Sequence, residues 1–201
     1  DLQYLDCDFF VCSAHKMYGP TGVGVLYGKE SWLNRMQPLE GGGEMIEHVH
    51  WEKTTYNALP YKYEAGTPNY IDTYAFGKAI EYIKHIGFEN IHSHEKQLVE
   101  YAESLLNEIN GVHIYAKQIK QKAGVISFNV YNNDHLIHPF DLGTLLDKQG
   151  IAVRTGHHRA EPLIDYLNIP GTIRISFALY NTKEDIDLFI QALKNAIGLL
   201  I

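Results

Sequence analysis

Residues 13–22 read Ser-Ala-His-Lys-Met-Tyr-Gly-Pro-Thr-Gly and place Lys16 between an apolar run and a bend rich in glycine and proline. The run before it, Phe9-Phe10-Val11-Cys12, predicts a buried strand because four apolar residues follow one another without a helical period. A second short strand is expected over residues 23–27, directly after the bend. Lys16 is therefore expected at the end of the first strand.

A lysine in this position can form a Schiff base with pyridoxal phosphate (PLP). Ser13 and His15 alternate along the predicted strand end, so both side chains could donate hydrogen bonds to the phosphate of that cofactor. Each residue also has a plain alternative. Lys16 can be an ordinary loop lysine, and His15 can be bonded to a nearby carbonyl, because a four-residue pattern matches by chance.

Composition places the chain among globular proteins. It has 201 residues, 45% of them hydrophobic and 20% charged, which is usual for a domain with a packed core. The net charge of −7 argues against nucleic acid or a basic membrane surface as a partner. No apolar run reaches the length of a membrane span and no signal peptide is visible. The sequence begins at Asp1 in mid-pattern, so we expect a piece of a longer protein.

The two cysteines are expected to stay free. Cys7 and Cys12 lie five positions apart near the first strand, and an odd separation on a strand points two side chains to opposite faces. Free thiols are typical of a reducing cytoplasm. We therefore expect a cytoplasmic protein in which both cysteines are small core residues.

The chain divides into two predicted parts, residues 1–87 and residues 88–201. In the first part a helix is expected over 29–36 and another over 73–87, where the apolar residues keep a 3-4 spacing. The three glycines at 41–43 predict a loop. The aromatic stretch 45–62 has no clean period, so a long functional loop and a packed surface hairpin both remain open.

The second part predicts a small α+β domain, with a sheet covered on one side. A capping box at Thr182 and Glu184 is expected to open the last helix. The apolar patterns predict helices over 98–109, 141–149 and from 181 onward, and strands over 112–115, 125–130, 151–153 and 172–177.

One arginine of the second part, Arg174, is a candidate carboxylate ligand. Arg174 shares one face of its predicted strand with Ser176, opposite Ile173 and Ile175. A guanidinium there can bind an α-carboxylate through two parallel hydrogen bonds. Arg154 is expected just after another strand. For each arginine a surface ion pair is the alternative. The paired histidines of the chain lack cysteines or carboxylates at ligand spacing, so no metal site is predicted.

Four stretches together resemble one enzyme family. They are residues 13–22, Glu40-Gly-Gly-Gly, Glu64-Ala-Gly-Thr-Pro-Asn and Val153-Arg-Thr-Gly-His-His. In this order they are similar to class V, fold-type I PLP enzymes, and most similar to cysteine desulfurases and selenocysteine lyases of the SUF type. The resemblance runs from Leu5 to the C-terminus. It implies an α/β fold, in which the end of a large PLP-binding domain (1–87) precedes a small C-terminal α+β domain (88–201).

The resemblance also assigns roles to residues. Lys16 would hold PLP, with Ser13 and His15 on its phosphate. Thr67 would reach the phosphate site of the neighbouring subunit in a homodimer, although Gly-Thr-Pro is also ordinary turn chemistry. Arg174 would bind the substrate carboxylate and Arg154 would be a second active-site arginine. The ring-nitrogen aspartate and the stacking histidine of such enzymes would lie upstream of residue 1.

One position departs from the family pattern. SUF-type desulfurases carry the sulfur-accepting cysteine directly after Thr-Gly-His-His, and this chain has Arg159 there. A guanidinium cannot attack sulfur, because it has no free lone pair at neutral pH. Arg159 could instead pair with Glu161, bind a carboxylate or lie in solvent.

Three functions therefore remain open. The first is a PLP-dependent lyase that removes sulfur or selenium from an amino-acid substrate and passes sulfur to an acceptor protein for iron–sulfur cluster assembly. The second is another class V enzyme, such as an epimerase or aminotransferase. The third is an inactive or truncated paralogue that serves as a dimerisation or partner-binding module.

Overall fold

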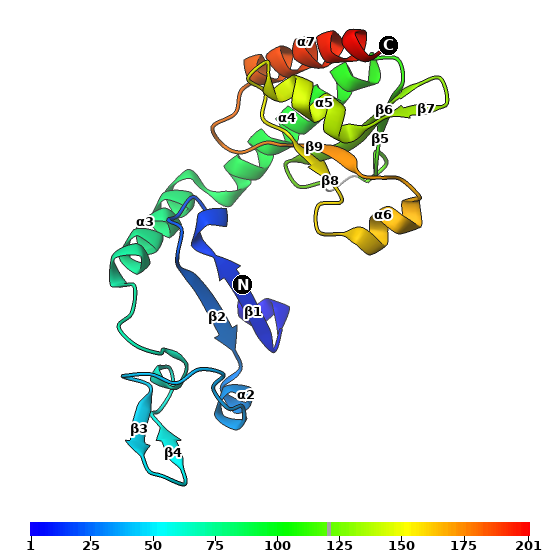
Figure 1. The fold of residues 1–201 in the computed structure, drawn as a ribbon. Helices are drawn as coiled ribbons and strands as arrows, with labels where there is room; N and C mark the ends of the chain where they lie inside the picture. Colours follow the sequence, from blue (N-terminus) through cyan, green and yellow to red (C-terminus); the bar gives the residue numbers. More distant parts are fainter. Residues whose placement is uncertain (120–121) are drawn as a thin grey trace. The chain divides into compact units, whose positions relative to one another are not determined.

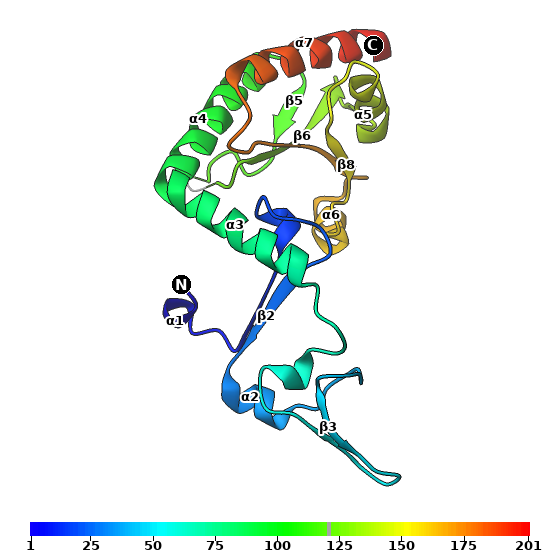
Figure 2. The same cartoon turned by 90° about the vertical axis from the view of Figure 1, so that its left-hand side faces the viewer.

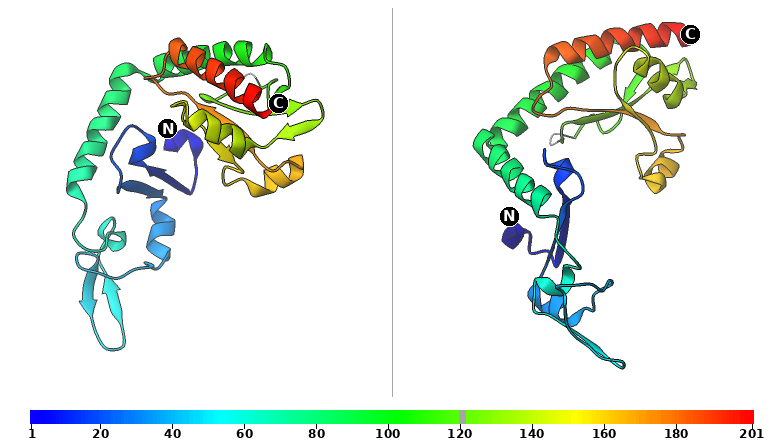
Figure 3. Two further views of the ribbon diagram at one scale, coloured as in Figure 1. Left: turned by 45° about the horizontal axis from the view of Figure 1, so that its top comes forward. Right: turned by 60° about the vertical axis from the view of Figure 1, so that its left-hand side comes forward.

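The computed structural model describes residues 1–119 and 122–201. They form two compact units, Asp1–Ile86 and Gly87–Ile201, which are treated separately below. Figure 1 labels their elements, and Figures 2 and 3 show the same ribbon from other sides. None of the helices within the described residues is long and apolar enough to cross a membrane.

The first unit consists of two separate β-ribbons and several helices. Strands β1 and β2 pair antiparallel, with Ser13 opposite Gly24, and β3 pairs with β4. The elements are α1 (Leu2–Leu5), β1 (Phe9–Ser13), the 3-10 helix η1 (Ala14–Lys16), β2 (Gly24–Gly28), α2 (Glu30–Arg35), β3 (Ile46–Val49), β4 (Thr54–Tyr56), the 3-10 helix η2 (Tyr61–Tyr63) and α3 (Tyr70–Ile86).

Burial of the first strand was predicted wrongly. The strand itself forms over Phe9–Ser13, but Phe10 is 41% exposed and Val11 is 70% exposed. A two-stranded ribbon can bury apolar side chains only where another element covers it. Within this unit that cover is small, because the buried cluster consists of Ala14, Phe76 and Ala79, with Cys12, Met17 and Val23 packed against it.

The aromatic stretch 45–62 forms a hairpin rather than a long loop. Strands β3 and β4 pair around the turn at residues 50–53, with an irregularity in register between Ile46 and His48. The predicted helices are present, and the second begins at Tyr70, three residues earlier than expected. It begins there because the Asn69 side chain accepts a hydrogen bond from the backbone N–H of Asp72, which is the action of an N-cap.

The second unit is a five-stranded antiparallel sheet with helices packed on it. The strand order is β5-β6-β9-β8, and β7 pairs with β6. In all the ribbon views α4, α5 and α7 lie together on one side of this sheet, and α6 lies away from them. The elements are α4 (Phe88–Asn107), β5 (Val112–Ile114), β6 (Val125–Asn132), β7 (His135–Ile137), α5 (Pro139–Asp147), β8 (Arg154–Gly156), α6 (Glu161–Leu167), β9 (Thr172–Ser176) and α7 (Lys183–Leu200).

The core of the second unit lies between the sheet and these three helices. Alternate residues of β6 point into it and are almost fully buried, among them Phe128 and Val130. Helix α5 contributes Leu142 and Leu146, and helix α7 contributes Leu193, all at 0% exposure. Period two on the strands and a 3-4 period on the helices therefore converge on one apolar layer.

Two local predictions for the second unit are corrected. Residues 151–153 are not a strand, and the strand begins one residue later, at Arg154. The capping box of α7 forms at Thr182, but its partner is Asp185 rather than Glu184. Because Thr182 is the N-cap, the third helical residue is Asp185, and that side chain accepts the N–H of Thr182 at 3.0 Å.

Candidate active site

The lysine segment is a short 3-10 turn at the end of β1. Ser13 is the last strand residue, and His15 and Lys16 belong to the turn Ala14–Lys16. The backbone N–H groups of Met17 and Gly19 both donate to the carbonyl of Ala14, at 2.8 and 2.9 Å. Ala14 is fully buried, whereas His15 and Lys16 are exposed. The turn thus anchors its first residue and presents the next two outward.

The expected alternation of Ser13 and His15 along a strand is wrong. His15 follows the change from extended to 3-10 backbone, so the strand period no longer relates the two side chains. Ser13 is half-buried and His15 is exposed. That Ser13 and His15 donate hydrogen bonds to the phosphate of PLP stays a prediction, which rests on their position next to Lys16.

Close contacts join three of the four motif stretches. The N–H of Gly66 donates to the carbonyl of Gly43 at 2.9 Å. A Cβ on Gly42 would lie 3.2 Å from the Cβ of Ala65, so the two segments run in close contact. The side-chain Nδ2 atom of Asn69 lies 3.5 Å from the carbonyl oxygen of Gly22, at the end of the lysine segment. Thr67 is exposed between these contacts.

The two candidate arginines occupy directly opposed positions on the sheet of the second unit. Arg154 of β8 pairs with Arg174 of β9 in the antiparallel register, so both side chains leave the same face of the sheet. Ile173 and Ile175 are buried on the other face, as the alternation predicts. Arg174 is half-buried, and its Nε atom is buried without a hydrogen-bond partner among the described residues.

His158 lies beside this pair and was given no role by sequence reasoning. Its Nε2 atom lies 2.8 Å from the hydroxyl oxygen of Thr172, a residue that is 3% exposed. Burial, and then the positive charges of Arg174 and Arg154, lower the pKa of the His158 imidazole. The ring is therefore neutral at physiological pH. Thr172 begins β9 and lies fourteen positions from His158 in the sequence. A local sequence pattern could therefore not predict this contact.

Residues 155–162 are polar, contain Gly156 and end at Pro162, a pattern that predicts a loop, but only part of this segment is a loop in the structure. Residues 155 and 156 belong to β8, and α6 begins at Glu161. The remaining loop, His157–Ala160, is closed by a hydrogen bond from the N–H of Ala160 to the carbonyl of His157 at 2.8 Å. Arg159 is exposed, and no ion pair involves it among the described residues. Glu161 instead pairs with His157 at 3.3 Å.

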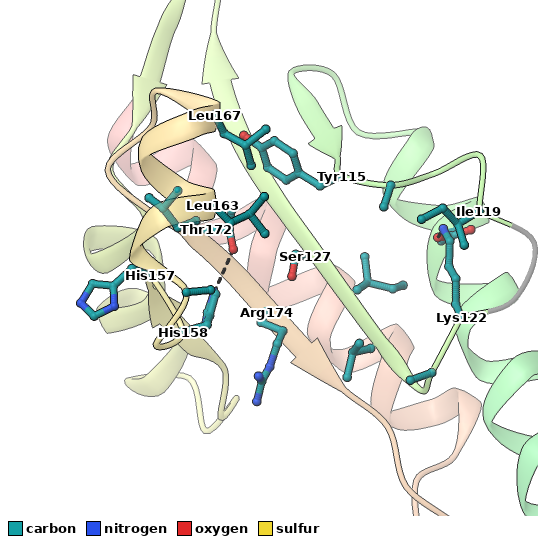
Figure 4. A pocket seen from close by; sticks show the side chains of 17 residues that line it. Tyr115, Ile119, Lys122, Ser127, His157, His158, Leu163, Leu167, Thr172 and Arg174 are labelled. Carbon is teal, nitrogen blue, oxygen red and sulfur yellow. Dashed lines mark hydrogen bonds and ion pairs between the residues drawn. The ribbon is translucent and has the colours of Figure 1, made fainter. Parts of the chain in front are cut away.

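A hollow of about 440 Å³ adjoins these residues in the second unit. His158 and Thr172, joined by a dashed line in Figure 4, lie near Arg174 along one side, and Ile119 and Lys122 lie across the hollow from them. Tyr115, also on its wall, has its pKa raised to about 12, chiefly by burial. Apolar walls with a few polar groups at one side are typical of ligand sites.

The residues of the lysine segment suit PLP. A hydroxyl, an imidazole and an amine come from Ser13, His15 and Lys16, and among the described residues no ion pair occupies the Lys16 amine. PLP requires such a lysine and donors for its phosphate. Within residues 1–119 and 122–201, no group of three or more histidine, cysteine, aspartate or glutamate side chains is arranged to hold a metal ion.

A family model described as aminotransferase class-V matches residues 1–189 of the chain. The chain therefore belongs to the class V aminotransferase family, as its four motifs predicted. Family membership implies PLP as the cofactor.

Proteins named probable cysteine desulfurase are similar to the chain. One from Staphylococcus epidermidis (strain ATCC 12228 / FDA PCI 1200) is 48% identical over 194 residues, and one from Halalkalibacterium halodurans is 47% identical. Each alignment covers 96% of this chain and 46% of the relative. The chain thus spans about half the length of the curated relatives it matches.

Solved structures agree with the predicted fold class. The cysteine desulfurase CsdA of Escherichia coli matches with a TM-score of 0.91 and 39% identity, over 100% of this chain and 49% of that one. A cysteine desulfurase from Thermococcus onnurineus NA1 matches with a TM-score of 0.89 and 36% identity, over 98% of this chain and 48% of the other. These matches confirm the α/β fold of PLP-dependent, fold-type I enzymes.

Proposed function

We propose that the chain is the C-terminal half of a PLP-dependent lyase of the cysteine desulfurase type. Its substrate is L-cysteine or L-selenocysteine, and its organic product is L-alanine. The observation that carries the proposal is the opposed pair Arg154 and Arg174, whose side chains share one face of the sheet. Two unneutralised cations at directly opposed positions destabilise a sheet unless an anion lies between them, and an α-carboxylate is such an anion.

Each candidate residue then has a defined task. When bound, PLP supplies an electron sink for the carbanion that forms at the substrate Cα. Lys16 holds the cofactor and moves the α proton, since its amine is exposed and unpaired in the described structure. Ser13 and His15 donate to the phosphate. Arg174 and Arg154 hold the carboxylate, which fixes the orientation of the bonds at Cα.

Position 159 limits this chemistry. SUF-type desulfurases carry at this position the cysteine whose thiol accepts sulfur, whereas this chain carries an exposed arginine. Cys7 and Cys12, the free thiols of the described residues, belong to the first unit, where Cys12 lies in β1 and Cys7 just before it. Both are half-buried rather than core residues. Selenocysteine can give alanine without a protein nucleophile if selenium is released as the neutral element, since the Cβ–Se bonding pair then stays on Cβ and takes up a proton. Such a release is compatible with Arg159, whereas transfer of sulfur from cysteine to a thiol at this position is not.

The arginine at position 159 also favours a second candidate, a paralogue without activity. The second unit has a continuous apolar core and a complete antiparallel sheet, so it can serve as a dimerisation or partner-binding module without catalysis. The two candidates differ in one measurable product, alanine.

The experiment uses the full-length protein that contains this chain, loaded with PLP. We expect alanine to form from L-selenocysteine, with little alanine or sulfide from L-cysteine. A Lys16→Ala variant is the control, because it removes the residue that must move the α proton. Absence of alanine from both substrates, in protein that retains PLP, supports the module instead.

We also propose a cytoplasmic homodimer, which passes sulfur to an acceptor protein for iron–sulfur cluster assembly where the nucleophile is present. Thr67 is exposed next to the contact between Gly66 and Gly43, and so is free to serve the neighbouring subunit. Mixing a Lys16→Ala subunit with a Thr67→Ala subunit restores one intact site per heterodimer in that arrangement. No recovery of activity in verified heterodimers means that Thr67 acts within its own chain.

A further inference from the structure

The loop that carries residue 159 has an unusual backbone. His158 and Arg159 are consecutive and both have positive φ, 54° and 66°. Residues other than glycine avoid this left-handed region because their Cβ atoms crowd the backbone. Two such residues in succession need contacts that hold them there.

The structure supplies those contacts at the base of the loop. Gly156 pairs with Thr172 in the ladder between β8 and β9. The backbones approach closely at this point, because a Cβ on Gly171 would lie 2.8 Å from the Cα of Gly156. Just beyond the ladder, the Nε2 atom of His158 meets the Thr172 hydroxyl at 2.8 Å. The His158 ring thus extends the pairing of the strands by one side-chain hydrogen bond.

We propose that His158 is a positioning residue that, through Thr172, holds residue 159 in a fixed orientation beside the two arginines. The inference rests on the proposed function, because it concerns the position from which the reacting group would act. His158 does not touch substrate in this account. It fixes the strained loop backbone, so residue 159 is presented outward while the ring itself stays half-buried.

The charges around the ring suit a neutral histidine in this role. Arg174 comes from β9, Arg154 from β8, and His157 from the loop itself, and all three disfavour a proton on His158. The carboxylate of α6 closest in sequence, Glu161, pairs with His157. A neutral imidazole has one donor and one acceptor nitrogen, and Nε2 is already engaged by Thr172. An anion bound between the two arginines would neutralise part of their charge and so weaken their lowering of the His158 pKa.

The test compares four variants in the full-length protein. His158→Ala and Thr172→Val each delete one side of the hydrogen bond, and Thr172→Val keeps the size of a buried side chain. His158→Gln keeps a polar group that can reach Thr172. His157→Gln is the matched control, since it changes the neighbouring exposed histidine and leaves the bond intact.

Hydrogen exchange of the backbone amides is the first measurement, and it needs no activity. We expect the amide of Ala160, which donates to the carbonyl of His157, to exchange about tenfold faster in His158→Ala and Thr172→Val, with β6 unchanged. His158→Gln should recover part of the protection, and His157→Gln should behave as the parent. Unchanged exchange at Ala160 in Thr172→Val overturns the proposal, whether or not His158→Ala folds.

The second measurement adds Arg159→Cys to each variant and follows persulfide formation from L-cysteine. Loss of positioning lowers kcat about tenfold and leaves KM nearly unchanged, because carboxylate binding stays with the arginines. An equal fall for His157→Gln contradicts the assignment. The proposed function fails if no alanine forms from L-selenocysteine, while the exchange experiment still decides the role of His158.

Discussion

Arg154 and Arg174 lie directly opposite each other across the antiparallel pair β8–β9. Side chains in such a pair are close neighbours, with Cβ atoms roughly 5 Å apart. Like charges on directly opposed side chains oppose folding of the sheet and favour binding of an anion. Stability and substrate binding are therefore expected to respond in opposite directions when one charge is removed.

Arg154→Gln tests this relationship. We expect the free energy of unfolding to rise by about 0.2–1 kcal/mol, because the like-charge repulsion is relieved. The KM for the amino-acid substrate should rise roughly tenfold or more, since a charge-assisted hydrogen bond contributes about 1.5–3 kcal/mol. Urea unfolding and steady-state kinetics of the full-length protein measure both. Lys194→Gln, an exposed charge change on α7, should alter neither, and loss of stability in Arg154→Gln would argue against the repulsion.

Lys16 is the expected attachment point of the cofactor. Borohydride reduction of the PLP-loaded protein, followed by peptide mapping, should find the label on Lys16 alone. Lys29 is a matched control, because its amine is held by Asp6 at 2.9 Å and by Asp8 at 3.2 Å. Lys29→Ala should keep the label and Lys16→Ala should lose it. A label on another lysine would refute the assignment.

The core of the second unit gives a prediction on stability. Leu142 of α5 is fully buried against the sheet, so Leu142→Ala should lower the free energy of unfolding by about 2–5 kcal/mol. Leu199 of α7 is 72% exposed, and Leu199→Ala should change it by less than about 0.5 kcal/mol. Chemical unfolding of the two variants provides the comparison, and equal losses would contradict the described core.

The half-buried ring of His158 predicts a pH dependence. In the folded protein its pKa lies below the value of about 6.5 that it regains on unfolding. Above pH 6.5 the ring is neutral in the folded and the unfolded state, so it does not make the free energy of unfolding depend on pH. As the pH falls below 6.5 the unfolded chain takes up the proton first, so the free energy of unfolding decreases.

The size of this effect is bounded. It stays below about 1.4 kcal/mol per pH unit, because the ring binds a single proton. His158→Gln should lose less stability than the parent between pH 7 and pH 5.5, as measured by urea unfolding at each pH. An unchanged pH dependence in this variant would mean that His158 is not the group responsible.

Periodicity was sufficient to predict helices α2, α3, α5 and α7 and one face of the candidate site. It did not predict α6, and α4 begins at Phe88, well before the expected start at residue 98. The alternation Ile173-Arg174-Ile175 predicted which side chains enter the core, and the structure buries both isoleucines. That prediction needed only the geometry of one strand. To predict that Arg154 lies opposite Arg174, the register between β8 and β9 must be known, and the residue types alone do not give it.

Contacts made by tertiary structure explain the remaining errors. Burial of Val11 depends on what covers a two-stranded ribbon, and apolar sequence alone cannot supply the cover. His15 left the strand period because the backbone turns at Ala14. The bond between His158 and Thr172 joins residues fourteen positions apart. Consecutive positive φ values at His158 and Arg159 likewise have no signature in the residue types.

We propose that this chain retains the site of a cysteine desulfurase but lacks its nucleophile at position 159. Persulfide formation from L-cysteine, followed by alkylation and mass spectrometry of the full-length protein, tests it most directly. We predict no persulfide in the arginine form, and a persulfide at position 159 in Arg159→Cys. Rapid persulfide formation by the arginine form would contradict the claim, because another thiol would then carry the sulfur.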